Sequence, residues 1–248
     1  MGAVDGEIPL GGGRLTAGVV RVGDTVRRPR SAASVFVAEL LTHLEQVGFT
    51  GAPRYLGVDD ADRDSFTFLP GTVTPRFQQW SDDQVAAAGA LLRSLHDATR
   101  GSALAGAMPV VLHGDPGSNN TVLDRHGMPT AFIDFDTAGP GQPVEDLAYL
   151  AWSWVLSGKP GARPVAVQAV QLRVLVDAYR AENCDRGCLL EAVTARQVLN
   201  AEWWREQARH PGPRGASREQ MLERAAWSQR EADFTQRHRR CFSSALVG

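Results

Sequence analysis

Four polar residues in one stretch of the sequence have the types and spacing needed to transfer a phosphoryl group. His113, Asp115 and Asn120 follow the pattern H-x-D-x-x-x-x-N, and Asp134 comes fourteen residues after Asn120. In such chemistry one aspartate accepts or orients the proton of an attacking hydroxyl, while an asparagine and a second aspartate hold Mg²⁺ against the phosphates. The set is therefore typical of a phosphotransferase site.

Neighbouring polar residues leave some of these assignments open. Asn119 is the adjacent alternative to Asn120, although the spacing from Asp115 favours Asn120. Asp136 is either a further group around the metal or a solvated turn carboxylate. We expect Asp146 to brace the loop by accepting backbone N–H bonds.

Short apolar runs flank the polar residues and would hold them in place. Residues 110–112, 121–123 and 131–133 are apolar or β-branched, and they predict three short strands. Both Asp115 and Asp134 then fall at strand ends, where loop side chains carry function on a rigid frame.

The chain changes character near residue 70. Before that point, strands are predicted at 7–10, 19–22, 25–28, 55–58 and 65–69, with a helix at 34–47. After it, helices are predicted at 81–96, 144–155, 165–182, 188–209 and 218–242. We therefore expect an α+β fold with a small β-rich lobe, 1–69, and a larger, mainly helical lobe, 70–248. Pro70-Gly71 would be the hinge, and the cleft between the lobes would be the ligand site.

Composition narrows the class of protein further. The 248 residues are 43% hydrophobic, with 26 Lys+Arg against 28 Asp+Glu and a formal net charge of −2. This balance argues against a partner that is a nucleic-acid polymer, because such binders usually carry a basic surplus. We find no apolar run long enough to span a membrane and no signal peptide. The chain is therefore not expected to bind a membrane. Its three cysteines, an odd number, fit a reducing compartment, so we expect a cytoplasmic protein.

The segment HGDPGSNN followed by IDFDTAGPGQPVEDLAY resembles the aminoglycoside phosphotransferase and choline kinase family. The match extends over most of residues 10–155, and it includes Leu69-Pro70-Gly71 and the helix end at Leu95-His96. The chain is also similar to short actinobacterial members described as phosphotransferases or trifolitoxin-immunity-like proteins. The resemblance implies a protein-kinase-like fold, ATP and Mg²⁺ as cofactors, and a hydroxyl group of a small molecule as the acceptor.

The same resemblance implies a role for each residue of the motif. Asp115 corresponds to the catalytic base, and His113 supports the catalytic loop. Asn120 and Asp134 correspond to the Mg²⁺ ligands. Residues 1–69 would be the nucleotide-binding lobe and residues 70–248 the catalytic and acceptor-binding lobe.

The nucleotide-binding lobe departs from the family pattern, which places a lysine on the third strand. Lys159 is the only lysine in the chain, so Arg27 is the expected replacement, with Arg28 on the opposite strand face. Its partner on the following helix would be Glu39, with Glu45 as the alternative.

Other nucleotide contacts are less distinctive. Gly12 and Gly13, within Gly11-Gly12-Gly13, either cover the phosphates or form a flexible turn. Phe68 and Leu69 lie in the interlobe linker that would meet the adenine, although Phe68 could equally be ordinary core.

The missing lysine keeps a second function open. A catalytically silent member of this family would bind a nucleotide or act as a toxin-immunity module. The C-terminal helices also differ from the acidic acceptor-binding surface expected of an aminoglycoside kinase. Residues 200–240 contain nine Arg and only six acids. This charge argues against a highly cationic acceptor. Trp203 and Trp204 are either core residues or an apolar wall for the acceptor.

Overall fold

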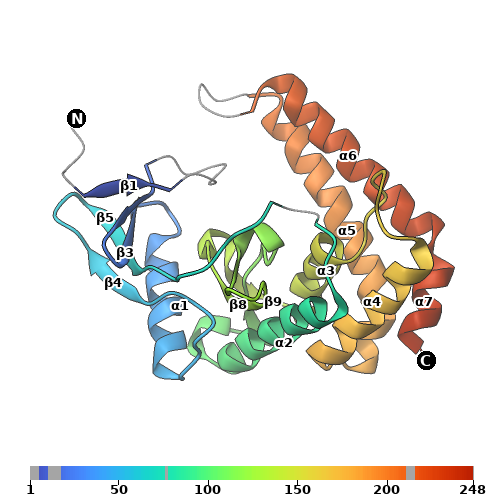
Figure 1. The fold of residues 1–248 in the computed structure, drawn as a ribbon, viewed down its shortest axis with the longest axis horizontal. Coiled ribbons are helices and arrows are strands. Elements are labelled where there is room, and N and C mark those ends of the chain that lie inside the picture. Colours follow the sequence, from blue (N-terminus) through green and yellow to red (C-terminus); the bar gives the residue numbers. More distant parts are fainter. Residues whose placement is uncertain (1–5, 11–17, 76–77, 211–215, 248) are drawn as a thin grey trace.

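The computed structural model describes residues 6–10, 18–75, 78–210 and 216–247. It has two lobes, a small one built on a β-sheet and a larger one built mainly of helices (Figure 1). This arrangement confirms the expected α+β fold class. The boundary at residues 69 and 70 stays a prediction.

The small lobe is a five-stranded antiparallel sheet with the strand order β1-β2-β3-β5-β4. The strands are β1 (Glu7–Pro9), β2 (Val20–Val22), β3 (Thr25–Pro29), β4 (Tyr55–Val58) and β5 (Arg63–Thr67). Helix α1 (Ser34–Gln46) follows β3 and buries Val37, Leu40, Leu41 and Leu44. These residues recur every three or four positions, so they share one helix face, and burying that face fixes the helix to the lobe.

The chain leaves the small lobe after β5 and joins the large lobe at Gly71 and Thr72. Gly71 has φ +150°, and a Cβ atom built on it would lie 2.4 Å from the Leu123 carbonyl oxygen. Thr72 and Leu123 exchange two backbone hydrogen bonds of 2.9 and 2.8 Å. Only glycine permits this close approach, which docks the linker onto the strand that follows the catalytic loop.

Two small β-ribbons carry the segments that contain the predicted catalytic residues. Strand β6 (Val110–Leu112) pairs with β9 (Gly139–Gly141), and β7 (Thr121–Leu123) pairs with β8 (Pro129–Phe132), both antiparallel. Strand β9 was not expected, because its sequence is Gly-Pro-Gly. Its pairing with a fully buried strand compensates for its poor strand propensity.

Helices form the rest of the large lobe and lie mainly below the ribbons and on the side away from the small lobe (Figure 1). They are α2 (Asp82–Thr99), α3 (Pro143–Trp154), α4 (Val165–Tyr179), α5 (Asn183–Gln207), α6 (Arg218–Arg237) and α7 (Arg239–Val247). Helix α2 begins with a capping box, in which Ser81 and Gln84 bond each other's backbone. The helix predicted over 218–242 is interrupted at His238, which separates α6 from α7. No helix among the described residues is long and apolar enough to cross a membrane.

Helix α3 is the central element of the large lobe. Every residue from Asp146 to Trp154 is buried. Its polar members, Asp146 and Ser153, therefore need partners inside the protein. The Ser153 hydroxyl oxygen accepts the Ser118 N–H at 3.3 Å, and Asp146 accepts from His113, Gly114 and His96.

Candidate active site

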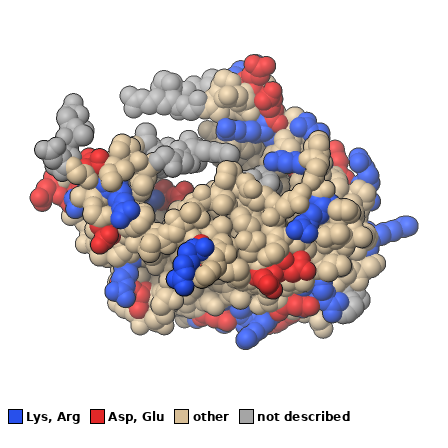
Figure 2. All heavy atoms as spheres, viewed as in Figure 1, with Lys and Arg blue, Asp and Glu red and all other residues tan. Residues whose placement is uncertain are grey.

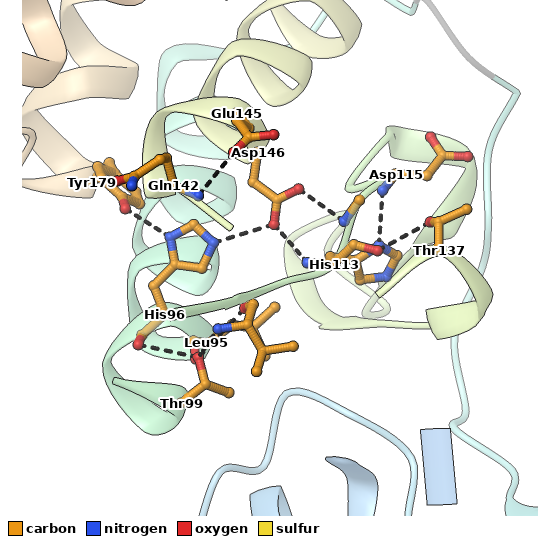
Figure 3. Close-up of polar contacts among 12 residues, drawn as sticks. Leu95, His96, Thr99, His113, Asp115, Thr137, Gln142, Glu145, Asp146 and Tyr179 are labelled. Carbon is orange, nitrogen blue, oxygen red and sulfur yellow. Dashed lines mark hydrogen bonds and ion pairs between the residues drawn. The ribbon is translucent and has the colours of Figure 1, made fainter. Parts of the chain in front are cut away.

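Asp115 lies in the loop between β6 and β7, and the surrounding backbone fixes it from two sides. Its N–H donates to Nδ1 of His113 at 3.3 Å. Its carbonyl oxygen accepts from Nδ2 of Asn120 at 2.9 Å and from Gly117 N–H at 2.8 Å. The partly buried side chain points away from the His113 ring (Figure 3). The loop thus holds one carboxylate outward on a backbone with little freedom to move.

His113 is fully buried and has a single consistent tautomer. Its Nε2 lies 3.1 Å from the Ile133 carbonyl oxygen, which can only accept, so Nε2 carries the proton. Nδ1 is then free to accept the Asp115 N–H. Burial lowers the pKa of His113, against the opposing influence of the nearby Asp146, and keeps the ring neutral. His113 therefore links the Asp115 loop to the end of the strand that precedes Asp134.

Asp146 braces this loop from helix α3, as expected from the sequence. Its Oδ2 accepts the His113 N–H at 2.6 Å, and its Oδ1 accepts the Gly114 N–H at 2.9 Å (Figure 3). His96 donates from Nε2 to Oδ2 at 3.2 Å. Burial opposes ionisation of this carboxyl, but the bonds from His96 and His113 outweigh it, so the pKa of Asp146 stays below its ordinary value.

His96 and Tyr179 extend the brace into helices α2 and α4. Nδ1 of His96 lies 2.7 Å from the Tyr179 hydroxyl. Because Nε2 of His96 donates to Asp146, Nδ1 accepts the hydroxyl proton of Tyr179. Burial raises the pKa of Tyr179, which keeps that proton in place. The sequence did not single out Tyr179, and nothing in its local pattern would have done so.

Asn120 and Asp134 are joined through the backbone. Asn120 is buried, and its carbonyl oxygen accepts the N–H of Ile133, the residue before Asp134. Its side-chain Oδ1 accepts from Nδ2 of Asn119 at 2.8 Å. The structure thus brings both predicted metal ligands to one edge of the two ribbons, with Asn119 as a neighbour that orients Asn120.

Asp134 has an unusual backbone for a residue with a side chain. It adopts a left-handed conformation, with φ 67° and ψ 63°, and its side chain remains 52% exposed. Such conformations are uncommon outside glycine and cluster at functional sites. Desolvation and the charge of Asp136 raise the pKa of Asp134. A cation bound there would relieve this cost of ionisation.

The oxygen atoms of Asn120 and Asp134 fit Mg²⁺ better than a metal whose ligands all come from the protein. Asn120 and Asp134 offer oxygen atoms, which Mg²⁺ prefers and usually supplements with phosphate oxygens and water. Among the described residues, no group of three or more His, Cys, Asp or Glu side chains could hold a metal ion. Metals bound mainly by histidine or cysteine therefore find no site in that part of the chain.

The orientation expected for the two β3 arginines is wrong, and the structure reverses it. Arg27 pairs with Asp59 at 3.1 Å, beside Arg63, on the side of the sheet away from the catalytic loops. Arg28 is buried and reaches Asp136 at 2.5 Å and Asp134 at 3.7 Å. Side chains alternate between the two faces of a strand, so the prediction that the two arginines lie on opposite faces is correct. Alternation alone does not determine which face meets the large lobe.

Glu39 does not become the partner of either arginine. It is exposed on α1 and lines a shallow surface groove with Thr42, His43 and Tyr55. Glu45, the alternative, pairs with Arg54 at 3.3 Å. The acidic partners of Arg28 come instead from the loop after β8, so the expectation for Glu39 is corrected.

The remaining nucleotide residues have mixed outcomes. Gly12 and Gly13 lie outside the described residues. Phe68 and Leu69 follow β5 in the linker and are partly buried. The Arg21 guanidinium lies 3.7 Å from the centroid of the Phe68 ring, so one ring face is already covered by a cation. A nucleotide role for Phe68 and Leu69 stays a prediction.

Arg196 on α5 is a site residue that the sequence analysis missed. Its Nη2 donates to the Gly114 carbonyl oxygen at 2.8 Å, and its guanidinium lies 4.5 Å from the centroid of the Tyr149 ring. Gly114 itself has φ +81°, and a Cβ atom there would lie 2.3 Å from the Thr137 carbonyl oxygen. Helix α5 is thus fixed to the catalytic loop at a point where that loop tolerates only glycine.

Comparison with known proteins agrees with this geometry. Residues 100–182 match the model of the phosphotransferase enzyme family (APH), and this segment includes His113, Asp115, Asn120 and Asp134. The trifolitoxin immunity protein of Rhizobium leguminosarum bv. trifolii is 32% identical, over 96% of this chain and 97% of that protein. The chain belongs to the phosphotransferase enzyme family.

Solved structures share the fold at low sequence identity. A choline/ethanolamine kinase family protein from Mesorhizobium loti has a TM-score of 0.64 and 19% identity, covering 98% of this chain and 92% of its own. The aminoglycoside 2'-phosphotransferase-IIIa, solved with GDP, has a TM-score of 0.64 and 14% identity, covering 93% of each chain. A spectinomycin phosphotransferase, solved with ADP and spectinomycin, has a TM-score of 0.61 and 12% identity, covering 93% of this chain and 92% of its own. The kinase-like fold expected from the motif is therefore confirmed.

Proposed function

We propose that this member of the phosphotransferase family is an ATP- and Mg²⁺-dependent O-phosphotransferase that acts on a hydroxyl group of a small molecule. The observation that carries the proposal is the catalytic loop itself. Asp115 presents its side chain outward from a backbone held by His113 and Asn120. A carboxylate fixed in this way serves to orient a substrate hydroxyl.

Asp115 would receive the acceptor. The hydroxyl would donate its hydrogen bond to the Asp115 carboxylate, and its oxygen would attack the γ-phosphorus of ATP. The bond between that phosphorus and the bridging oxygen breaks, ADP leaves, and the hydroxyl proton passes to Asp115. Neutral His113 stays outside the proton transfer, because both of its ring nitrogens are already committed to backbone partners.

Asn120 and Asp134 would hold Mg²⁺ through their side-chain oxygens. Bound there, Mg²⁺ supplies positive charge to the phosphate oxygens. The backbone bond between Ile133 and Asn120 keeps the two ligands in register, so the chain pays the ordering cost on folding and not at each turnover.

The face of α5 that follows Arg196 supports an acceptor with apolar surface. Leu199 and Trp203 lie on the same side of the helix as Arg196, one and two turns further on, and they are 60% and 42% exposed. Acidic and basic side chains are interspersed over the described residues of the face seen in Figure 2. These features suit an uncharged or mildly anionic acceptor better than a polycation. Such an acceptor would be an antibiotic-like molecule or a metabolite.

A second function, of a different class, is a silent module that binds a nucleotide or gives immunity to a toxin. Two observations favour it. The chain has no lysine in the small lobe, and Arg28, the β3 arginine that faces the large lobe, already contacts Asp134 and Asp136. The 32% identical relative is named as an immunity protein. Immunity by phosphorylation of a toxin and immunity by sequestration would give the same resistance in cells.

A transfer screen separates the two functions. The purified protein is mixed with ATP labelled in the γ-phosphate, Mg²⁺ and panels of hydroxylated antibiotics, peptides and metabolites, with the Asp115→Ala variant as the blank. Label that appears in an acceptor only with the wild-type protein supports the enzyme. Resistance in cells that Asp115→Ala retains in full, without transfer by the wild-type protein, would instead establish the silent module.

A further inference from the structure

The contact between Arg28 and the metal-binding loop joins the two lobes of the molecule. Arg28 belongs to β3 in the small lobe, while Asp134 and Asp136 lie between β8 and β9 in the large lobe. Its Nη2 is 2.5 Å from Oδ1 of Asp136, and its Nη1 is 3.7 Å from Oδ1 of Asp134. The guanidinium therefore pairs closely with Asp136 and lies next to Asp134, the carboxylate that is expected to hold Mg²⁺.

The environment of Arg28 strengthens this electrostatic contact. The Arg28 side chain is 10% exposed, and its guanidinium lies 5.0 Å from the centroid of the Phe66 ring. Charges interact more strongly where solvent is largely excluded. Two carboxylates share one guanidinium, so part of their negative charge remains uncompensated and can attract a further cation.

The hydrogen-bonding capacity of Arg28 is only partly used. Within the described part of the chain, Nε and Nη2 of Arg28 and Oδ1 of Asp136 are buried and have no hydrogen-bond partner. Nη2 and Oδ1 still form an ion pair at 2.5 Å, so Nε is the donor that is left without an acceptor. Buried arginine donors without partners are costly, so they favour an anionic ligand that can accept from them.

We propose that Arg28 exchanges partners during catalysis, from the metal-binding carboxylates to the phosphates of the nucleotide. In the first arrangement its positive charge lowers the affinity of Asp134 for a divalent cation that arrives alone. In the second, its donors bind phosphate oxygens and leave Asp134 to the cation. Metal and nucleotide would therefore bind together rather than separately. The inference rests on the proposed function, because it takes Asp134 as the metal ligand.

The proposal makes two predictions of opposite sign for one substitution. Arg28→Gln removes the charge and keeps much of the side-chain length. It should tighten the binding of Mn²⁺ alone by roughly tenfold or more, because a unit charge within about 4–6 Å shifts the ionic equilibrium of a carboxylate by one to three powers of ten. It should weaken the binding of ADP in EDTA by roughly tenfold or more, through loss of charge-assisted bonds to phosphate.

Arg27→Gln is the matched control, because Arg27 is the adjacent residue on the same strand and its partner, Asp59, lies outside the site. It should leave both affinities within about twofold of wild type, since the Arg27 charge is already paired with Asp59 and faces away from Asp134 and Asp136. Arg28→Lys keeps the charge and should also keep Mn²⁺ binding weak. Mn²⁺ binding is followed by electron paramagnetic resonance and ADP binding by calorimetry, on variants whose thermal unfolding shows that they are folded.

The two arms separate failure of this inference from failure of the proposed function. The exchange of partners would be overturned if Arg28→Gln binds Mn²⁺ no more tightly than the wild type does and Arg28→Lys has the same Mn²⁺ affinity as Arg28→Gln. Unchanged ADP affinity in Arg28→Gln would overturn it as well. A wild-type protein that binds no nucleotide would contradict the proposed function, while the Mn²⁺ arm would still report whether Arg28 opposes the cation.

Discussion

Removal of the Asp146 carboxylate tests how the catalytic loop is held. Asp146→Ala leaves three buried donors without an acceptor: the N–H groups of His113 and Gly114 and Nε2 of His96. Each unsatisfied donor costs about 1–3 kcal/mol, and the relief of no longer burying a charge offsets part of the sum. We expect a loss of about 3–5 kcal/mol in the free energy of unfolding, a large share of the roughly 5–15 kcal/mol of a typical domain.

Asp146→Asn should cost less, because the amide still offers one oxygen. The two carboxylate oxygens accept from different backbone N–H groups, so one of these meets the amide NH₂ and loses its partner. We expect a loss of about 1–3 kcal/mol. Asp97→Ala is the control, since the Asp97 side chain is 47% exposed and pairs with Arg93 on the surface of α2. Its loss should stay below about 1 kcal/mol.

Urea unfolding of the three variants provides the measurement. The order of stability should be wild type, Asp97→Ala, Asp146→Asn and then Asp146→Ala. Hydrogen exchange should show faster exchange of the Gly114 amide in both Asp146 variants. An equal loss for Asp97→Ala and Asp146→Ala, with that amide unchanged, would refute the role of Asp146 as the brace of the loop.

Three further predictions concern metal, pH and acceptor. Asp134→Asn should weaken nucleotide binding in Mg²⁺ and leave it nearly unchanged in EDTA; equal affinities in Mg²⁺ would contradict the assignment of the ligand. Because burial lowers the pKa of His113, the unfolded chain binds its proton first as pH falls below about 6.5, and stability should then fall by up to about 1.4 kcal/mol per pH unit. His113→Gln keeps a donor for Ile133 and should remove this component in urea titrations across pH, whereas an identical pH profile would argue against it. Trp203→Ala should raise KM for the acceptor roughly tenfold through lost apolar contact, with KM for ATP as the internal control; an unchanged acceptor KM would place the acceptor elsewhere.

Much of the catalytic region could be predicted from the sequence because short apolar runs bracket the polar residues. Strands β6 and β7 coincide with the runs at 110–112 and 121–123, and Asp115 falls in the loop between them. The role of Asp146 as a brace also followed from its residue type and position. In each case a local pattern was enough, since the partners lie at the ends of clearly marked elements.

The orientation of β3 could not be predicted in the same way. Adjacent arginines occupy both faces of the strand, so alternation of polarity does not distinguish the face that turns to the large lobe. That choice depends on where Asp134 and Asp136 lie after folding, about a hundred residues further along the chain. The same reason explains Arg196 and Tyr179, whose roles arise only from contacts between distant helices.

The most direct test of the central claim is the behaviour of Asp115→Ala in transfer and in nucleotide binding, measured on the same preparation. Our account predicts that ADP affinity in Mg²⁺ stays within about twofold of wild type, because Asp115 is proposed to contact the acceptor and not the nucleotide. Turnover with the acceptor from the screen should fall by on the order of 10²–10⁴, the usual contribution of a positioned general base. Turnover that remains at the wild-type level in this variant would contradict Asp115 as the catalytic base of this phosphotransferase.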